Sequence, residues 1–205
     1  MPLGWHSDAK LTTRFRKPFF TPCGPAQAHG ANSIPRTMVT CMAIKTAKDL
    51  FIHELSDIYS AEKQLTKALP RLARAAENPD LAAAFETHLE ETQGQIERID
   101  QVVKVLGIRL KRIKCAAMEG LVEEGKEVID SIEKGPVRDA ALIGGAQKVE
   151  HYEIASYGTI AALAKQLGYK DALPYLLETL EEEKATDEKL TLLAEQGGNQ
   201  KAASK

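Results

Sequence analysis

Apolar residues from position 46 onward recur with the period of an α-helix. They follow one another at alternating steps of three and four, which places them on one face of each helix. The pattern predicts four long helices, over about 46–77, 80–106, 136–167 and 171–197. Thr46 and Asp49 have the spacing of a capping box for the first helix, and Asp80 is the expected cap of the second. Gly107 and Gly168 are the expected ends of the second and third helices.

The spacing between these helices predicts their connectivity. A short break at 78–80 makes the first two helices antiparallel neighbours, and the turn after Gly168 does the same for the second pair. About thirty residues, 107–136, separate the pairs and hold a shorter amphipathic segment around Leu121 and Val128. Two hairpins joined by one long crossover are typical of ferritin-like bundles, so we predict an all-α, ferritin-like four-helix fold with a short extra helix.

The second pair of helices repeats the first at an offset of 91 residues. At this offset Glu62 falls on Glu153, and residues 89–91 fall on residues 180–182. A site built symmetrically between four helices would leave such a repeat, although two glutamate-rich helices can also match by chance.

The composition fits one domain with an aliphatic core. Hydrophobic residues make up 43% of the 205 residues, aromatic residues 5%, and the formal net charge is -2. No apolar run approaches the roughly 18 residues that a membrane span requires. The three cysteines form no CxxC pair, which argues against a disulfide framework and a zinc knuckle. We therefore expect a soluble, cytoplasmic protein with neither a membrane nor a nucleic acid as partner.

The first 41 residues differ from the rest of the chain. They hold five basic residues against one acidic residue and show no sustained helical period. They lack both the apolar core of a secretory signal and the amphipathic pattern of a transit peptide. We interpret residues 1–41 as a disordered or non-native extension, 42–196 as the ferritin-like domain, and 197–205 as a flexible tail.

Acidic residues interrupt the apolar stripe of three helices at mid-length, and the second helix also becomes polar there. In the second helix a histidine lies on the stripe with a glutamate one turn away. The predicted inward stripe of the last helix runs through Leu173, Leu176, Leu180, Glu183, Asp187, Leu190 and Ala194. A register error of one residue would turn Glu183 outward and Glu182 inward. The candidate metal ligands are Glu62, His88, Glu91, Glu150, Glu153, Glu183 and Asp187.

The physical chemistry of buried carboxylates leaves two interpretations. An isolated buried carboxylate costs several kcal/mol, so a group of them cannot stay ionised without compensating cations. Iron or manganese would supply that charge, because both accept carboxylate oxygens together with an imidazole, here in a carboxylate-bridged dinuclear centre. Alternatively, the carboxyl groups share protons in a metal-free dimeric scaffold or interaction protein, and their pKa values are raised.

Six segments of the chain resemble the YciE/YciF family of bacterial ferritin-like stress proteins. They are DLFIHELSDIYSAEKQL, AFETHLEETQGQIERIDQVV, IKCAAMEGLVEEG, RDAALI, AQKVEHYEIASYGT and LEEEKATDEKL, and the resemblance extends over about residues 42–195. It implies a ferritin-like bundle, a cytoplasmic homodimer, general-stress expression and metal binding. Neither the segment after Glu91 nor the one after Glu183 contains Glu-x-x-His, which departs from the wider di-iron pattern and argues against ferroxidase activity.

Overall fold

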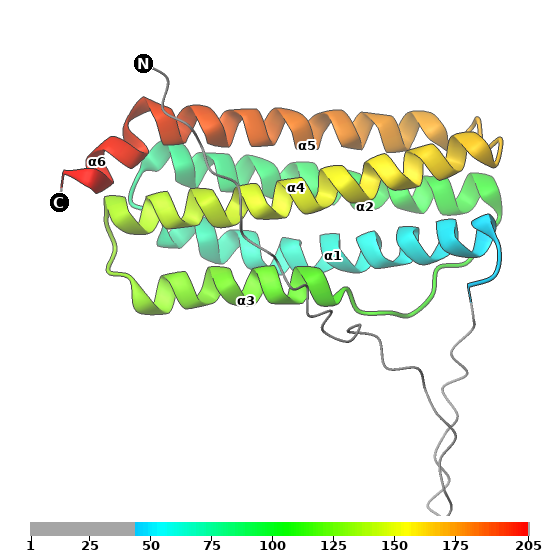
Figure 1. Cartoon of the computed structure of the whole chain (residues 1–205), viewed down its shortest axis with the longest axis horizontal. Helices are drawn as coiled ribbons and strands as arrows, with labels where there is room; N and C mark the ends of the chain where they lie inside the picture. Colours follow the sequence, from blue (N-terminus) through cyan, green and yellow to red (C-terminus); the bar gives the residue numbers. More distant parts are fainter. Residues whose placement is uncertain (1–43, 205) are drawn as a thin grey trace, which may run out of the picture. The chain divides into compact units, whose positions relative to one another are not determined.

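The computed structural model describes residues 44–204, which form a bundle of long helices without a strand among them (Figure 1). The four long helices are α1 (Ala47–Ala75), α2 (Pro79–Leu106), α4 (Pro136–Gln166) and α5 (Leu173–Leu193). The crossover contains the shorter helix α3 (Ala116–Ser131). Residues 1–41, assigned above to an extension, lie outside the described residues, and so does Lys205.

Contacts between the helices confirm the predicted ferritin-like arrangement. α1 packs against α2 and α4 packs against α5, which gives the two hairpins. α1 also contacts α4, α2 contacts α5, and α3 lies against both α1 and α4. The long crossover therefore runs along the bundle, as Figure 1 shows. No helix within residues 44–204 is long and apolar enough to cross a membrane.

The helix ends follow the sequence signals with one exception. Thr46 and Asp49 form the predicted capping box, and Gly107 and Gly168 end their helices with φ of 59° and 71°. The prediction that Asp80 caps α2 was wrong, because the Asn78 side chain accepts the bond from the Asp80 backbone N–H at 2.9 Å. Pro79 occupies the first turn, where a missing N–H costs nothing, and this moves the cap one residue ahead of it.

The last predicted helix continues past its expected end. α5 is followed by a π-helical turn, Ala194–Gly198, and by the short helix α6 (Asn199–Ala203). Two consecutive glycines lower helix propensity by about 1 kcal/mol each but do not forbid helical backbone. Contacts of both segments with α4 offset that cost.

The 91-residue offset also holds for the buried positions. The buried positions of α1 that fall on buried positions of α4 are Phe51 on Leu142, Leu55 on Ala146, Ile58 on Val149, Glu62 on Glu153, Leu69 on Ile160 and Ala73 on Ala164. In the second helices they are Phe85 on Leu176, His88 on Thr179, Thr92 on Glu183, Gln95 on Thr186 and Ile99 on Leu190. The hairpins thus share one packing pattern, and polar side chains occupy the middle of it.

Candidate metal centre

Four glutamates lie in the interior of the bundle at mid-length. Glu62 on α1, Glu153 on α4 and Glu183 on α5 are fully buried, and Glu150 on α4 is 2% exposed. Apolar residues fill the buried stripes above and below this layer, with threonines next to Glu183 on α5, and all four carboxyl groups are buried. Glu183, and not its half-buried neighbour Glu182, is the inward residue of α5.

Three of these glutamates and one histidine converge on a common point. His88, Glu150, Glu153 and Glu183 each offer one ligand atom, and these four atoms lie within 4.8 Å of one another. The side chains come from α2, α4 and α5, so the tertiary fold brings them together. A nitrogen and three carboxylate oxygens at this spacing form a donor set for one metal ion.

A carboxylate outside the cluster orients the imidazole of His88. Nδ1 of His88 lies 3.3 Å from Oε2 of Glu91, and Nε2 lies 3.4 Å from Oε1 of Glu150. With its hydrogen on Nδ1 donated to Glu91, the ring directs the lone pair of Nε2 toward the cluster. The bond to His88 also lowers the pKa of Glu91, which keeps that acceptor ionised. Glu91 thus lies beside the cluster and not in it, and its Oε2 also faces the Thr186 hydroxyl at 3.5 Å.

Glu62 borders the cluster from α1. The Tyr157 hydroxyl donates a hydrogen bond to Oε1 of Glu62, and the carboxyl group of Glu62 lies near enough to that of Glu153 for its charge to raise the pKa of Glu153. Oε2 of Glu62 is buried without a partner. Glu62 therefore has one oxygen held by the protein and one available.

Burial dominates the electrostatics of the four glutamates. Loss of hydration is the largest cause that raises the pKa of Glu62, Glu150, Glu153 and Glu183. Repulsion from Glu183 further raises the pKa of Glu62 and Glu150, whereas His88 lowers that of Glu183. Four carboxylates in this layer cannot all be ionised unless a positive charge joins them.

The unpaired polar atoms show that the residues present fit a metal ion. Both carboxyl oxygens of Glu153, both of Glu183, Oε2 of Glu150 and Nε2 of His88 are buried and lack a hydrogen-bond partner. Buried polar groups are nearly always paired, so a cluster of unpaired acceptors is typical of a site that binds a cation or shares protons. Oxygen donors with one imidazole match the preferences of iron and manganese.

Asp187 lies apart from this cluster. Its side chain is 22% exposed, and its Oδ1 accepts from Nε2 of Gln147 at 3.3 Å and lies 3.5 Å from Nε2 of the exposed His151. Thr186 is buried in its place, and Thr179 is buried where Leu180 was predicted. The predicted stripe of α5 was therefore wrong at alternate positions, because threonines can turn inward when their hydroxyl groups find partners.

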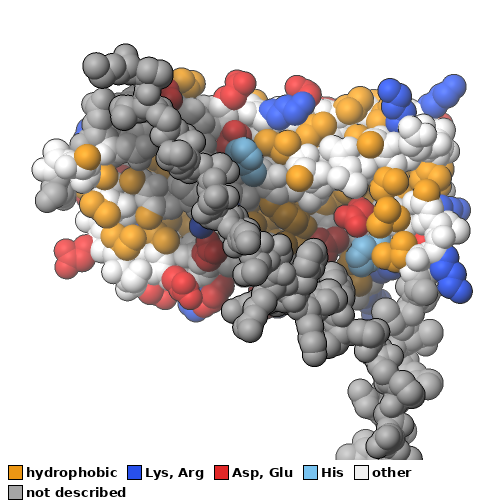
Figure 2. Space-filling model, in the orientation of Figure 1, with side chains coloured by type: hydrophobic (Ala, Val, Ile, Leu, Met, Phe, Trp, Pro, Cys, Tyr) orange, Lys and Arg blue, Asp and Glu red, His pale blue; other side chains and the backbone are white. Residues whose placement is uncertain are grey.

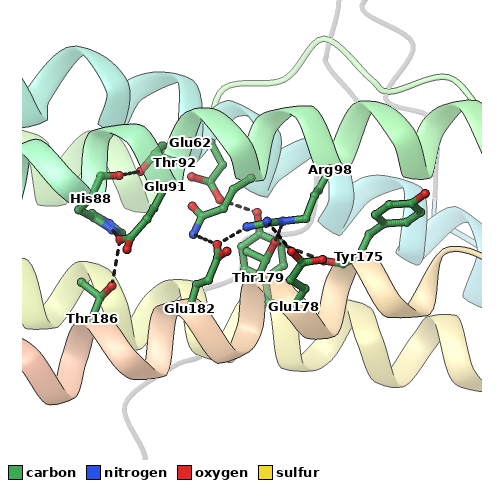
Figure 3. A network of polar contacts seen from close by, with 12 residues as sticks. Glu62, His88, Glu91, Thr92, Arg98, Tyr175, Glu178, Thr179, Glu182 and Thr186 are labelled. Carbon is green, nitrogen blue, oxygen red and sulfur yellow. Dashed lines mark hydrogen bonds and ion pairs between the residues drawn. The ribbon is translucent and has the colours of Figure 1, made fainter.

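Polar contacts outside the cluster join α2 to α5 (Figure 3). Arg98 donates to the hydroxyl of Thr179 at 2.9 Å and to Glu178 at 3.1 Å, and it also pairs with Glu182. Gln95 donates to Oε2 of Glu182 at 3.2 Å. No local sequence signal indicates this network, which pairs α2 with α5 beside the cluster.

Two further tyrosine contacts were missed from sequence. Tyr157 lies one turn from Glu153, and this spacing was the available signal for its contact with the glutamate layer. Tyr152 donates to Asp57 at 2.6 Å and lies 3.0 Å from Sγ of Cys115, which itself accepts from a backbone N–H as the cap of α3. No local pattern indicates the second contact, because it joins the crossover to α1 and α4.

The fold and the cluster define a class. This is a ferritin-like helical bundle with a buried carboxylate and histidine cluster that could hold a metal ion. A family model described as a domain of unknown function, DUF892, matches residues 46–203, and the chain belongs to that family. Protein YciF of Escherichia coli strain K12 is 66% identical over 165 residues, which cover 80% of this chain and 99% of YciF.

Solved structures agree with this assignment. The crystal structure of the E. coli stress protein YciF has a TM-score of 0.74 and covers 77% of this chain and 99% of its own. YcfI from Rhodopseudomonas palustris, 48% identical, has a TM-score of 0.71 over 74% of this chain and 96% of its own. A protein from Xanthomonas campestris, 21% identical with a TM-score of 0.58, supports the fold alone. The resemblance to the YciE/YciF family is thus confirmed.

Proposed function

We propose that the protein holds iron or manganese in the interior of its bundle and handles iron or peroxide during stress. The observation that carries this proposal is the convergence of His88, Glu150, Glu153 and Glu183 with unpaired donor atoms. The link to stress comes from the similarity to YciF, which is described as a stress protein.

The roles of the residues follow from their contacts. His88 and the three glutamates of the cluster would be the ligands of one ion, and Glu91 would keep the imidazole in the ligating tautomer. Glu62, which is near Glu153 and has an unpaired Oε2, would contribute to a second ion of a dinuclear centre. Bound iron or manganese supplies redox chemistry toward oxygen or peroxide. The apolar layers around the centre exclude bulk water from it.

Elemental analysis of loaded protein tests the site. The full chain is treated with chelator, incubated aerobically with Fe(II) or Mn(II), desalted and analysed. We expect between about one and two ions per chain for the unmodified protein and a decrease of about tenfold or more for Glu153→Gln combined with Glu183→Gln. The control combines Glu90→Gln with Glu188→Gln. It changes the net charge by the same amount as the test variant, but on the exposed faces of α2 and α5. Equal metal content in both double variants would refute the proposal.

A metal-free bundle with shared protons is the second candidate. It is favoured by the hydrogen bond from Tyr157 to Glu62 and by Thr92 and Gln95, which occupy α2 positions where a dinuclear centre would place a glutamate and a histidine. Thermal melts separate the two candidates. A metal that binds only the folded chain raises the melting temperature, whereas neither chelator nor metal shifts it in a proton-sharing scaffold.

A homodimer and a cytoplasmic location remain part of the proposal. Several large apolar side chains on the bundle are more than 40% exposed, among them Val105, Leu177 and Leu192. Such side chains are compatible with a subunit interface. Light scattering coupled to size-exclusion chromatography measures the mass in solution, and a monomer mass at all concentrations would contradict the dimer.

A further inference from the structure

A cavity of about 310 Å³ opens beside the glutamate cluster. Its outer part lies between α3, α1 and α4, and its inner part extends to residues of α2 and α5. Aliphatic side chains make most of the wall, and Phe85 is the aromatic residue that lines it. Figure 2 views the face of α3 and α4, where hydrophobic side chains show between charged ones.

The two ends of this cavity differ in chemistry. At the inner end it is bounded by His88 and Glu150, which are both at least 97% buried and carry the unpaired atoms Nε2 and Oε2. At the outer end, the exposed side chains of Lys148 on α4 and Glu124 on α3 form an ion pair of 2.7 Å. The cavity thus has an apolar body, a polar inner end at the candidate metal centre and a charged rim.

Small residues keep this space open. Gly125 on α3 and Gly144 and Gly145 on α4 all line the cavity within helices, where glycine is less stable than alanine. A Cβ atom added at Gly144 or Gly145 would meet nothing within 4 Å, and one at Gly125 would make only an ordinary contact with Leu72. Close helix packing therefore does not require glycine at any of these positions. Their effect in the folded chain is to leave room.

The size and lining of the cavity select the ligand class. Engineered apolar cavities of about 150 Å³ bind benzene, so a cavity twice as large has room for roughly twelve carbon atoms. Hydrogen peroxide and water need several hydrogen-bonding partners, which the aliphatic wall does not offer. Charged molecules would lose hydration without compensation in the apolar body of the cavity.

We propose that this cavity binds an uncharged apolar organic molecule of roughly ten to fifteen carbon atoms. Its inner end would contact His88 and Glu150, so the bound molecule would lie next to the metal centre. Binding itself needs only the cavity. The further statement that this molecule is a substrate or effector of the metal centre rests on the function proposed above.

Fluorescence titration of the metal-free full chain with 1-aminonaphthalene, an uncharged ten-carbon fluorophore within the proposed size range, tests the binding. We expect a saturable, blue-shifted increase at one probe per chain. Gly145→Leu should fill the cavity and weaken binding about tenfold or more, while its melting temperature stays equal or rises because leucine is the better helix former. Gly94→Leu is the matched control, since Gly94 is also half-buried in a helix with open space around it but does not line the cavity.

Two results would overturn the proposal. The first is the absence of saturable binding, and the second is Gly145→Leu binding the probe like the unmodified chain. If the unmodified chain fails to bind the probe and is a dimer that Gly145→Leu dissociates, the cavity is a contact between copies. Because the titration contains no metal, failure of the metal proposal in elemental analysis leaves this test unaffected. Probe binding that changes the Mn(II) affinity of the loaded chain would support the substrate or effector role.

Discussion

Replacing Glu153 by glutamine separates the metal role of the cluster from its cost in stability. The carboxyl group of Glu153 is fully buried and neither oxygen has a partner. Burial raises its pKa well above the ordinary value of 4.5, and repulsion from Glu62 and Glu183 raises it further. Glutamine keeps the shape, removes the charge and can donate to neighbouring carboxylates. We therefore expect Glu153→Gln to increase the unfolding free energy of the metal-free protein.

The magnitude of this gain depends on pH in a calculable way. A carboxyl group that stays protonated in the folded protein costs about 1.4 kcal/mol for each pH unit above its unfolded pKa of 4.5. At pH 7 the upper limit is about 3 kcal/mol, and at pH 5 it is below about 1 kcal/mol. For a chain of this size, the upper limit at pH 7 corresponds to a rise of about 6–12 °C in melting temperature.

Urea denaturation in the presence of chelator, at pH 5 and pH 7, measures both values. Glu90→Gln on the exposed face of α2 is the control and should leave the unfolding free energy within about 0.5 kcal/mol. With Mn(II) the lead of the variant narrows, because metal stabilises the unmodified protein by about 3 kcal/mol at a hundredfold excess over Kd and the variant by less. An equal gain at both pH values, or a loss at pH 7, would refute the assignment of Glu153 to a desolvated acidic layer.

Three further results are expected. The four buried carboxyl groups should stabilise the metal-free protein most below about pH 4.5, where they are protonated in both the folded and the unfolded chain. As pH rises toward their raised pKa values, each group should lower the unfolding free energy by up to about 1.4 kcal/mol per pH unit, which thermal melts measure. Asp139→Ala should lower the unfolding free energy by about 3 kcal/mol in urea, because the buried Asp139 carboxylate accepts the backbone N–H groups of Glu77 and Asn78 at 2.8 Å. His88→Ala should weaken Mn(II) binding about 10–100-fold in competition titrations, and Glu91→Gln should weaken it less.

The fold was predictable because its signals are local and redundant. Helical periodicity, the capping box at Thr46 and the glycines at 107 and 168 each indicate an element without reference to distant residues. The length of the crossover then distinguishes a ferritin-like bundle from one with short loops throughout. The helix ends that differ from the prediction, at Asn78 and beyond Gly198, depend on a proline position and on contacts with α4.

The register of α5 shows where local signals end. Positions 176, 183 and 190 satisfy either of two stripes, one through Leu180 and Asp187 and the other through Thr179 and Thr186. Hydrophobicity favours the stripe with Leu180. The structure has the other stripe, because Arg98 donates to Thr179 across the interface with α2. Such a partner is invisible from α5 alone, which is why Asp187 was predicted as a ligand and lies beside the buried layer. Glu91, on α2, also lies beside it, and the other five candidate ligands lie within it.

The two hairpins repeat each other in packing and differ in ligand chemistry. A symmetric dinuclear centre would take a glutamate and a Glu-x-x-His pair from each hairpin. Here the equivalent inner positions hold Thr92 and Gln95 in α2 and Glu183 and Thr186 in α5, so neither histidine is present. Gln95 donates to Glu182 at 3.2 Å, and the Thr186 hydroxyl faces Glu91 at 3.5 Å. Both of these carboxylates lie outside the cluster.

Two residues off the symmetric pattern supply the missing donors. At the 91-residue offset, His88 has a threonine as its counterpart and Glu150 has Tyr59, so each occurs in one hairpin alone. Both lie in one cluster with Glu153 and Glu183. Glu62 is outside that cluster, and its Oε1 accepts a hydrogen bond from Tyr157. The donors are therefore concentrated around one position. This asymmetry supports one strong ion position, and it makes any second ion depend on Glu62 and on a carboxylate shared with the first.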